Sequence, residues 1–311
     1  MSYMTYDLII IGGGPAGVAA AVYAARKKIK TLLVAKEFGG QSNVSLNIEN
    51  WIGTASISGM DLADNLKKHV FVYKDKGLEV EEGSLVLKIE RKGSDFLVSL
   101  DNGKSHNTKT VFVGSGSYRR KLEAKGADIF ENKGITYCAS CDGPLFADQD
   151  VVVVGGGNAA FETVAQLVAY CKTVTLLHRG IHFKADEITV EKVLANPKVK
   201  SFTNVEVEEI KGSKFVQSLI FKSKISGETT ELNVTGVFVE IGQLPNTEFA
   251  KDLVPLDEFN RIIVDPMTGR AEIPGVWAAG DCTNGLYHQN NIAAGDAVKA
   301  IEDLYQYLHK R

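Results

Sequence analysis

The stretch Asp7-Leu-Ile-Ile-Ile-Gly-Gly-Gly-Pro-Ala-Gly17 decides the fold class of this sequence. Its apolar run, rich in β-branched residues, is too short for a helix and ends in glycines, which predicts a buried strand. The Ala-rich segment 16–25 predicts a helix, and the apolar run 31–34 predicts a second strand. A strand, a glycine turn, a helix and a strand within about 30 residues form a βαβ unit of a parallel sheet.

The same pattern returns in the second half of the chain. An apolar run at 150–154 leads through Gly155-Gly156-Gly157 into an Ala-rich helix from Asn158 to about Tyr170, and then into strand 173–177. Short runs with turn signals follow each unit and predict antiparallel strands. We therefore expect an α/β protein with two Rossmann-like, doubly wound three-layer nucleotide-binding domains, each with an antiparallel β insertion. The predicted insertion strands are 78–90, 96–101 and 110–113, with an Asn-Gly hairpin turn at 102–103, and later 205–210, 216–224 and 231–234.

Composition bounds the remaining possibilities. With 311 residues two domains are expected, and 44% hydrophobic with 23% charged residues excludes intrinsic disorder. A formal charge of −3 gives no general attraction to nucleic acid or to an anionic membrane. The N-terminus lacks the features of a signal peptide, and no run approaches about 18 apolar residues, so we expect a cytoplasmic protein without a membrane partner. Turn-rich stretches predict domain segments 1–115, 116–243 and 244–311, with the middle one inserted.

The first glycine turn matches a dinucleotide-binding fingerprint. Gly12, Gly14 and Gly17 have the spacing G-x-G-x-x-G between a predicted strand and helix, and Glu37 follows 20 residues beyond Gly17. Such glycines let the backbone approach a pyrophosphate at a helix N-terminus, and the carboxylate binds a ribose. The motif suits FAD or NAD, and a turn packed for fold reasons alone is the alternative.

The second glycine turn has the same fingerprint with alanine in its third place. No acidic residue stands at the end of the next strand, which instead carries a basic run from His178 to Lys184. Cationic donors suit a 2′-phosphate better than a ribose hydroxyl, so we expect NADPH, with NADH possible and a merely solvated basic surface as the other interpretation. The candidate coenzyme contacts are Gly155, Gly157, Asn158, Ala160, Glu162, His178, Arg179 and Lys184.

Cys138-Ala-Ser-Cys141 is a C-x-x-C pair in a chain with four cysteines. In a reducing compartment this spacing favours a redox-active pair over an inert buried one. Zinc would need a second pair of ligands, which Cys171 and Cys282 do not form, so we expect no metal and interpret both as packing residues. Asp142 beside the pair is a candidate proton donor and acceptor, or else a turn cap.

A segment in the last 40 or so residues of the chain is a candidate contact to the nucleotide bound at the first fingerprint. Gly275-Val-Trp-Ala-Ala-Gly-Asp281 predicts a strand, and a small-residue helix follows from Asn291. We expect Asp281 to be a second cofactor contact, with a helix N-cap as its alternative role.

Together these motifs resemble the low-molecular-weight thioredoxin reductases, a family of flavoprotein disulfide reductases, across the whole chain. Three segments, at 141–146, 184–186 and 241–247, are most similar to the flavoprotein portion of alkyl hydroperoxide reductases, and we expect this protein to lack the N-terminal thioredoxin-like extension of those proteins. The motifs that carry the family resemblance are Gly12–Gly17, Phe38–Gln41, Ile48–Trp51, Tyr137–Gly143, Gly155–Ala160 and Ala279–Asp281.

The resemblance implies an FAD domain made of 1–115 and 244–311, an inserted NAD(P)H domain, a homodimer and a domain rotation that alternates access to the flavin. It also implies that Cys141 faces the flavin, that Cys138 attacks the protein substrate and that Asp142 is the acid/base. The flavin contacts implied in this way are Gly12, Gly14, Pro15, Ala16, Gly17, Glu37, Gly40, Gln41, Asn50, Gly280, Asp281, His288, Gln289 and Asn290.

The expected function is electron transfer from NAD(P)H through FAD and the Cys138/Cys141 disulfide to a thioredoxin-like protein. Alternatives are a reductase of a peroxiredoxin- or glutaredoxin-like carrier, as in the alkyl hydroperoxide reductases, an FAD-dependent dithiol oxidase, and a non-catalytic FAD redox sensor. The second fingerprint argues against the oxidase. Two departures from the family pattern, Gly180 where an Arg is usual and Lys184 in place of a distal Arg, leave both coenzymes open. A third, Gly114-Ser-Gly116 for the usual Ala-Thr-Gly, falls in the predicted FAD domain.

Overall fold

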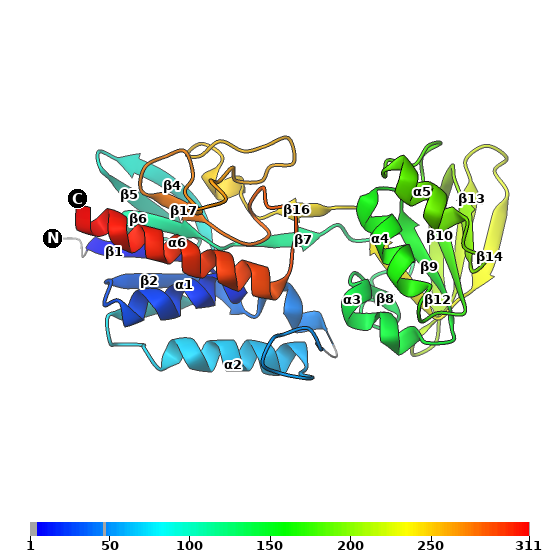
Figure 1. Ribbon diagram of the computed structural model, residues 1–311, viewed down its shortest axis with the longest axis horizontal. Coiled ribbons are helices and arrows are strands. Elements are labelled where there is room, and N and C mark those ends of the chain that lie inside the picture. Colours follow the sequence, from blue (N-terminus) through cyan, green and yellow to red (C-terminus); the bar gives the residue numbers. More distant parts are fainter. Residues whose placement is uncertain (1–4, 46–47, 311) are drawn as a thin grey trace. The chain divides into compact units, whose positions relative to one another are not determined.

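The computed structural model describes residues 5–45 and 48–310. The chain forms two compact units, and the second is inserted into the sequence of the first (Figure 1). Of the described residues, unit 1 comprises 5–44, 48–118 and 244–310, and unit 2 comprises 119–243. The chain leaves unit 1 in β7 (Ser117–Arg119) and returns in β16 (Gln243–Pro245), and these two strands pair with each other. None of the helices in the described residues is long and apolar enough to span a lipid bilayer.

Unit 1 is built on a parallel sheet. Its parallel strands lie in the order β3-β2-β1-β6, and β17 pairs with the end of β6, which is the strand order of a doubly wound nucleotide-binding fold. Helices α1 and α6 lie side by side on this sheet (Figure 1), and their alanines allow the close approach. The strands are β1 (Thr5–Gly13), β2 (Thr31–Phe38), β3 (Leu78–Glu82), β6 (Ser105–Val113) and β17 (Val276–Ala278); the helices are α1 (Pro15–Arg26), α2 (Gly59–Phe71) and α6 (Asn290–Lys310), with short 3-10 turns η1 (Gly40–Val44) and η3 (Glu248–Ala250).

The strand predicted at 78–90 is wrong, because the chain breaks it in two. Gly83 has a φ of 85° and ends β3, which pairs in parallel with β2, while β4 (Val86–Lys92) pairs in antiparallel with β5 (Asp95–Leu100). The strand predicted at 110–113 also belongs to the parallel sheet, since β6 pairs with β5 only through its first half and with β1 from Asn107 to Val113.

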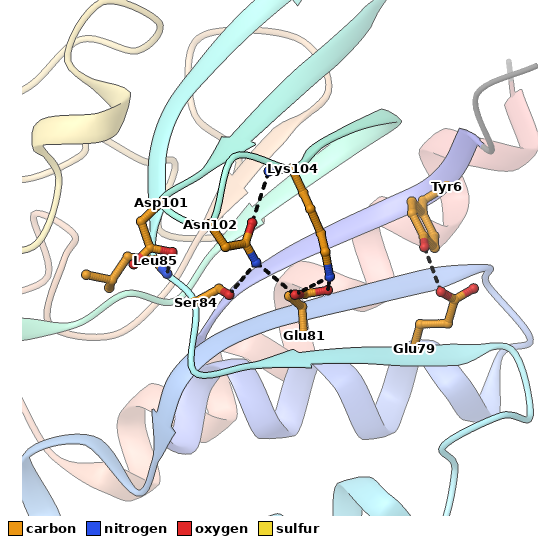
Figure 2. Close-up of polar contacts among 8 residues, drawn as sticks. All are labelled: Tyr6, Glu79, Glu81, Ser84, Leu85, Asp101, Asn102 and Lys104. Carbon is orange, nitrogen blue, oxygen red and sulfur yellow. Dashed lines mark hydrogen bonds and ion pairs between the residues drawn. The ribbon is translucent and has the colours of Figure 1, made fainter. Parts of the chain in front are cut away.

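Side chains hold this break together (Figure 2). Asn102, in the predicted hairpin turn, donates to Glu81 at 2.9 Å and to Ser84 at 2.8 Å, and Lys104 pairs with Glu81 at 2.8 Å. The backbone N–H of Leu85 donates to an Asp101 carboxylate oxygen at 2.9 Å. Figure 2 shows these groups close together where the chain passes from β3 to β4. The hairpin turn therefore provides hydrogen-bond partners for polar groups of residues 81–85, where the predicted strand 78–90 is interrupted.

Unit 2 repeats the same core and confirms the two-domain α/β prediction. Its sheet has the order β11-β10-β9-β15-β8, with every neighbouring pair parallel. Its insertion is a separate antiparallel sheet, β12-β13-β14. The helix predicted to reach about Tyr170 ends at Leu167. The strands are β8 (Ile135–Thr136), β9 (Asp150–Gly155), β10 (Thr173–Leu177), β11 (Val199–Phe202), β12 (Val205–Gly212), β13 (Val216–Ser223), β14 (Thr229–Asn233) and β15 (Gly236–Glu240); the helices are α3 (Ala139–Asp142), α4 (Asn158–Leu167) and α5 (Glu187–Leu194), with a 3-10 turn η2 (Gly143–Phe146).

Candidate active site

The first fingerprint turn lies between β1 and α1 in unit 1. A Cβ on Gly17 would lie 1.8 Å from the carbonyl oxygen of Gly12, and a Cβ on Gly12 would lie 2.2 Å from that of Gly114. Both positions therefore need glycine for packing. A Cβ on Gly14 would meet no protein atom within 4 Å. Only this central glycine faces open space, as a backbone that receives a pyrophosphate should.

The N-terminus of α1 completes a site for an anion. Pro15 begins the helix, Gly14 caps it without a side chain, and its first turn holds no acidic residue. The first N–H groups of a helix lack partners within it and attract negative charge. Gly280 approaches this end closely, because a Cβ on it would lie 3.4 Å from the Cβ of Ala16. Glu37 is exposed near the end of β2, and Gly40, with a φ of 60°, lies near Gly14.

The other predicted flavin contacts of unit 1 come together from three distant segments. Gln41 donates to Asp281 at 3.5 Å, and the imidazole of His288 lies 4.0 Å from the same carboxylate. Asn50 donates to Gln289 at 3.2 Å. Asn290 donates to Ser42 at 2.8 Å. Because α6 begins at Asn290, Asp281 is not its N-cap, and that alternative is wrong.

The second fingerprint turn lies between β9 and α4 in unit 2. A Cβ on Gly157 would meet nothing within 4 Å, and α4 starts without a side-chain cap or an acidic first turn. A Cβ on Gly155 would lie 2.4 Å from the carbonyl oxygen of Glu240 and 2.8 Å from the Cβ of Ala160. Alanine is accommodated in the third place because Gly155 leaves room for its methyl group. The open central glycine again matches a pyrophosphate site.

The loop after β10 folds over this turn. Its backbone N–H at Lys184 donates to Gly156 at 2.6 Å, and that at Asp186 donates to the Asn158 side chain at 2.9 Å. Arg179 and Lys184 are exposed, as is Glu162 on α4.

His178 has a different environment from the rest of this loop. It is only 9% exposed, and its Nε2 lies 2.9 Å from the carbonyl oxygen of His182. Its ring fills the space that a Cβ on Gly156 would need. His178 therefore packs against the second fingerprint turn, whereas Arg179 and Lys184 in the same loop are exposed.

The cysteine pair follows β8 in unit 2. Cys138 and Cys141 form a disulfide with a Cα–Cα distance of 5.3 Å, and the short helix α3 spans the two residues between them. Asp142 ends α3, and the hydroxyl of Thr136 donates to its Oδ2. Burial raises the pKa of Asp142, and the hydrogen bond from Thr136 lowers it in part. A raised pKa favours the protonated form of the carboxyl group, as a proton donor requires.

The other two cysteines are buried and unpaired. Burial raises the pKa of the Cys171 and Cys282 thiols to about 11 each, which keeps them protonated and unreactive at neutral pH. Within the described parts of the chain, no three His, Cys, Asp or Glu side chains gather closely enough to hold a metal ion.

Sequence reasoning missed one buried charge pair in unit 2. Glu240 ends β15 beside Gly155, its side chain is 9% exposed, and it accepts hydrogen bonds from Arg119 at 3.2 Å and Thr163 at 3.0 Å. Burial raises the pKa of Glu240, while Arg119 and Thr163 lower it. A lone carboxylate after the apolar run 236–239 was the available signal.

The geometry agrees with what known proteins show. Residues 6–297 match the Pyridine nucleotide-disulphide oxidoreductase family. The chain therefore belongs to this family, and its fold and CxxC disulfide are those of the thioredoxin reductase type, as the sequence resemblance predicts.

Individual relatives agree with that class. The thioredoxin reductase from Streptococcus pyogenes MGAS5005 superimposes with a TM-score of 0.90 and 35% identity over 100% of both chains. An alkyl hydroperoxide reductase protein of Xanthomonas campestris pv. phaseoli is 38% identical over 306 residues, which are 97% of this chain and 57% of that protein. A NADH dehydrogenase from Bacillus subtilis (strain 168) is 37% identical over 303 residues, 97% of this chain and 58% of that protein. The chain thus spans less than two thirds of these curated relatives.

Membership in the family implies FAD and a pyridine nucleotide as cofactors, and the residues present fit both. Each fingerprint has a central glycine, Gly14 or Gly157, that faces open space at an uncapped helix N-terminus. The polar cluster that joins Gln41, Asp281 and His288 lies in the same unit as the first fingerprint and suits a flavin ring with its own donors and acceptors.

Proposed function

We propose that this protein is an FAD-dependent disulfide reductase that passes electrons from NAD(P)H through FAD to the Cys138–Cys141 disulfide, and from there to a thioredoxin-like protein. The observation that supports it most is the CxxC disulfide beside the half-buried carboxyl group of Asp142, in a unit that also carries a nucleotide fingerprint. A dinucleotide fingerprint would have no use in a dithiol oxidase that works without nicotinamide.

Each part of the site has a role in this proposal. The turns at Gly14 and Gly157 bind the pyrophosphates of FAD and of NAD(P)H, respectively. Bound FAD accepts a hydride and supplies two electrons to a disulfide. The reduced Cys138 attacks the protein disulfide and Cys141 resolves the mixed disulfide, while Asp142 gives and takes the proton. Arg179 and Lys184 provide cations for a 2′-phosphate, so NADPH is the proposed coenzyme.

The test uses purified protein reconstituted with FAD. It should be yellow and should reduce an aromatic disulfide with NAD(P)H. A Cys138→Ser variant and a Cys141→Ser variant should each retain reduction of the bound flavin by NAD(P)H and lose disulfide reduction. A protein that cannot take up FAD would refute the proposal, and turnover by both cysteine variants at the wild-type rate would do the same. The same turnover assay excludes a non-catalytic redox sensor.

A second candidate is a reductase whose substrate is a peroxiredoxin-linked or glutaredoxin-like carrier. The likeness to an alkyl hydroperoxide reductase protein over 97% of the chain favours it. Measuring kcat/KM with a thioredoxin beside such carriers separates the two, because the physiological partner should be favoured by at least about tenfold, or about 1.4 kcal/mol. The homodimer stays a prediction, to be checked by light scattering of the holoenzyme.

A further inference from the structure

Thr136 occupies an unusual position beside the cysteine pair. It ends the edge strand β8, is 7% exposed and comes two residues before Cys138. Its hydroxyl donates to Oδ2 of Asp142 and also accepts the backbone N–H of Cys138 at 3.4 Å. A hydroxyl has one donor and two lone pairs, so both bonds are made together.

These bonds close a ring around the redox motif. The backbone N–H of Asp142 donates to the carbonyl oxygen of Cys138 at 3.0 Å, which ties the two ends of the motif together through the main chain. Thr136 ties the same two residues through a side chain. Oδ2 of Asp142 is therefore held on the strand side, whereas no hydrogen bond to Oδ1 is found within the described residues.

We propose that Thr136 is a positioning residue for the redox disulfide, whose hydroxyl fixes Oδ2 of Asp142 so that Oδ1 exchanges protons with the cysteine pair. This inference rests on the proposed function. Neither the sequence motif nor the family resemblance assigned a role to Thr136, since one hydroxyl in a short strand gives no pattern. It makes Thr136 a determinant of when Asp142 is protonated.

Protons and electrons balance in the step that Asp142 assists. The Cys138 thiolate attacks one sulfur of the substrate disulfide; that S–S bond breaks, and the leaving thiolate takes the proton of Asp142. The Cys141 thiol then gives its proton to the Asp142 carboxylate, and its thiolate attacks Cys138 in the mixed disulfide. The Cys138–Cys141 bond reforms and the second substrate sulfur leaves as a thiolate, so two electrons have moved from the dithiol to the substrate.

Few charged groups compete with Thr136 for control of Asp142. The elements packed most closely against α3 are η2 and α4, and the titratable side chain they carry is Glu162. Tyr137, next to the motif, donates to Glu131, and burial raises its pKa. Burial and the Thr136 hydrogen bond are accordingly the two causes that set the pKa of Asp142. Because the hydroxyl stabilises the carboxylate, its removal raises that pKa.

The test compares Thr136→Val, which removes the hydroxyl at constant shape, with Thr136→Ser, which keeps it. Thr173→Val is the matched control: its hydroxyl donates to Asp150 at 2.6 Å at the start of β10, the opposite end of the strands from the cysteine pair. Each FAD-loaded variant is assayed for reduction of its flavin by NAD(P)H and for the pH dependence of kcat/KM with an aromatic disulfide. Thr136→Ala replaces the valine variant if that variant does not fold.

In Thr136→Val we expect the limb of the pH profile that reports Asp142 to move to higher pH by about 1 to 2, the effect of losing a hydrogen bond to a charged group. Flavin reduction should stay unchanged, and Thr136→Ser and Thr173→Val should keep the wild-type profile. An unmoved profile in Thr136→Val, or loss of activity in Thr136→Ser as well, overturns the positioning role. If the wild type itself reduces no disulfide, the proposed function has failed instead.

Discussion

Replacing Gly14, the central glycine of the first fingerprint, should weaken cofactor binding without disturbing the packing of the fold. In Gly14→Ala the new methyl group meets no protein atom within 4 Å, and the backbone there has φ −76° and ψ −176°, an extended conformation open to any residue. Alanine is a poorer helix N-cap than glycine, at a cost of about 1 kcal/mol, which is small beside the stability of a folded domain. The folded protein should therefore tolerate the change.

The same substitution should weaken the binding of FAD. The methyl group occupies the space through which a pyrophosphate reaches the N–H groups of the turn. Losing one hydrogen bond to a charged group, about 1.5 to 3 kcal/mol, weakens FAD binding roughly tenfold to hundredfold. Gly17→Ala behaves in the opposite way, because its Cβ would lie 1.8 Å from the Gly12 carbonyl oxygen. Such overpacking costs about 1 to 3 kcal/mol or more of folding free energy.

The assay measures the FAD dissociation constant of the apoprotein by flavin fluorescence, and the unfolding midpoint in urea. Gly157→Ala is the matched control, since its methyl group is equally unobstructed but lies in the second fingerprint. It should bind FAD normally and raise the KM for NAD(P)H. If Gly14→Ala binds FAD as tightly as the wild type, the first turn is a packing feature and not a pyrophosphate site.

The remaining predictions concern charge. Arg179→Ala should lower kcat/KM with NADPH by roughly tenfold to hundredfold and leave kcat/KM with NADH nearly unaffected. Lys172→Ala, at another exposed cation, is the control. An equal loss with both coenzymes means that Arg179 does not contact the 2′-phosphate. Burial raises the folded pKa of Glu240, so its contribution to stability is present below the ordinary Glu pKa and is lost as pH rises through the folded value. The free energy of unfolding, measured in urea from pH 4 to 8, should therefore rise with pH in Glu240→Gln relative to the wild type. The gain should be about 1.4 kcal/mol for each unit by which the pKa of Glu240 is raised. A difference between the two proteins that stays constant with pH contradicts this assignment.

Local patterns in the sequence predicted most of the fold. The glycine turns at 12–17 and 155–160 lie between the predicted strands and helices, because glycine placement and apolar runs are properties of a short window. The strand break at Gly83 escaped prediction for a physical reason. The contacts that hold the break come from Asp101, Asn102 and Lys104, in a turn 16 to 23 residues further along the chain, so no pattern within residues 78–90 contains them.

The candidate site shows the same limit of local patterns. The CxxC pair and the fingerprints are each contiguous in sequence, so their residue types and spacing identify them without the structure. The partners of these motifs are not contiguous. Gln41 meets Asp281, and Arg119 meets Glu240, only because parallel strands bring distant loops to one end of a sheet. His178 shows a second limit of local patterns, since its place in a basic run gives no sign that its ring is buried beneath Gly156.

The parallel sheet of unit 2 explains why these missed residues gather where they do. The carboxyl ends of parallel strands lie at one edge, and there β8 leads into the cysteine pair, β9 into the second fingerprint turn, and β15 ends in Glu240. An unpaired carboxylate beside that turn would repel a phosphate, and Arg119, from the segment that enters the unit, supplies Glu240 with a cation. Arg119 neutralises Glu240 while Thr136 fixes Asp142 beside the disulfide. Each of these two carboxyl groups, the buried one of Glu240 and the half-buried one of Asp142, is thus controlled by a residue that no motif identifies.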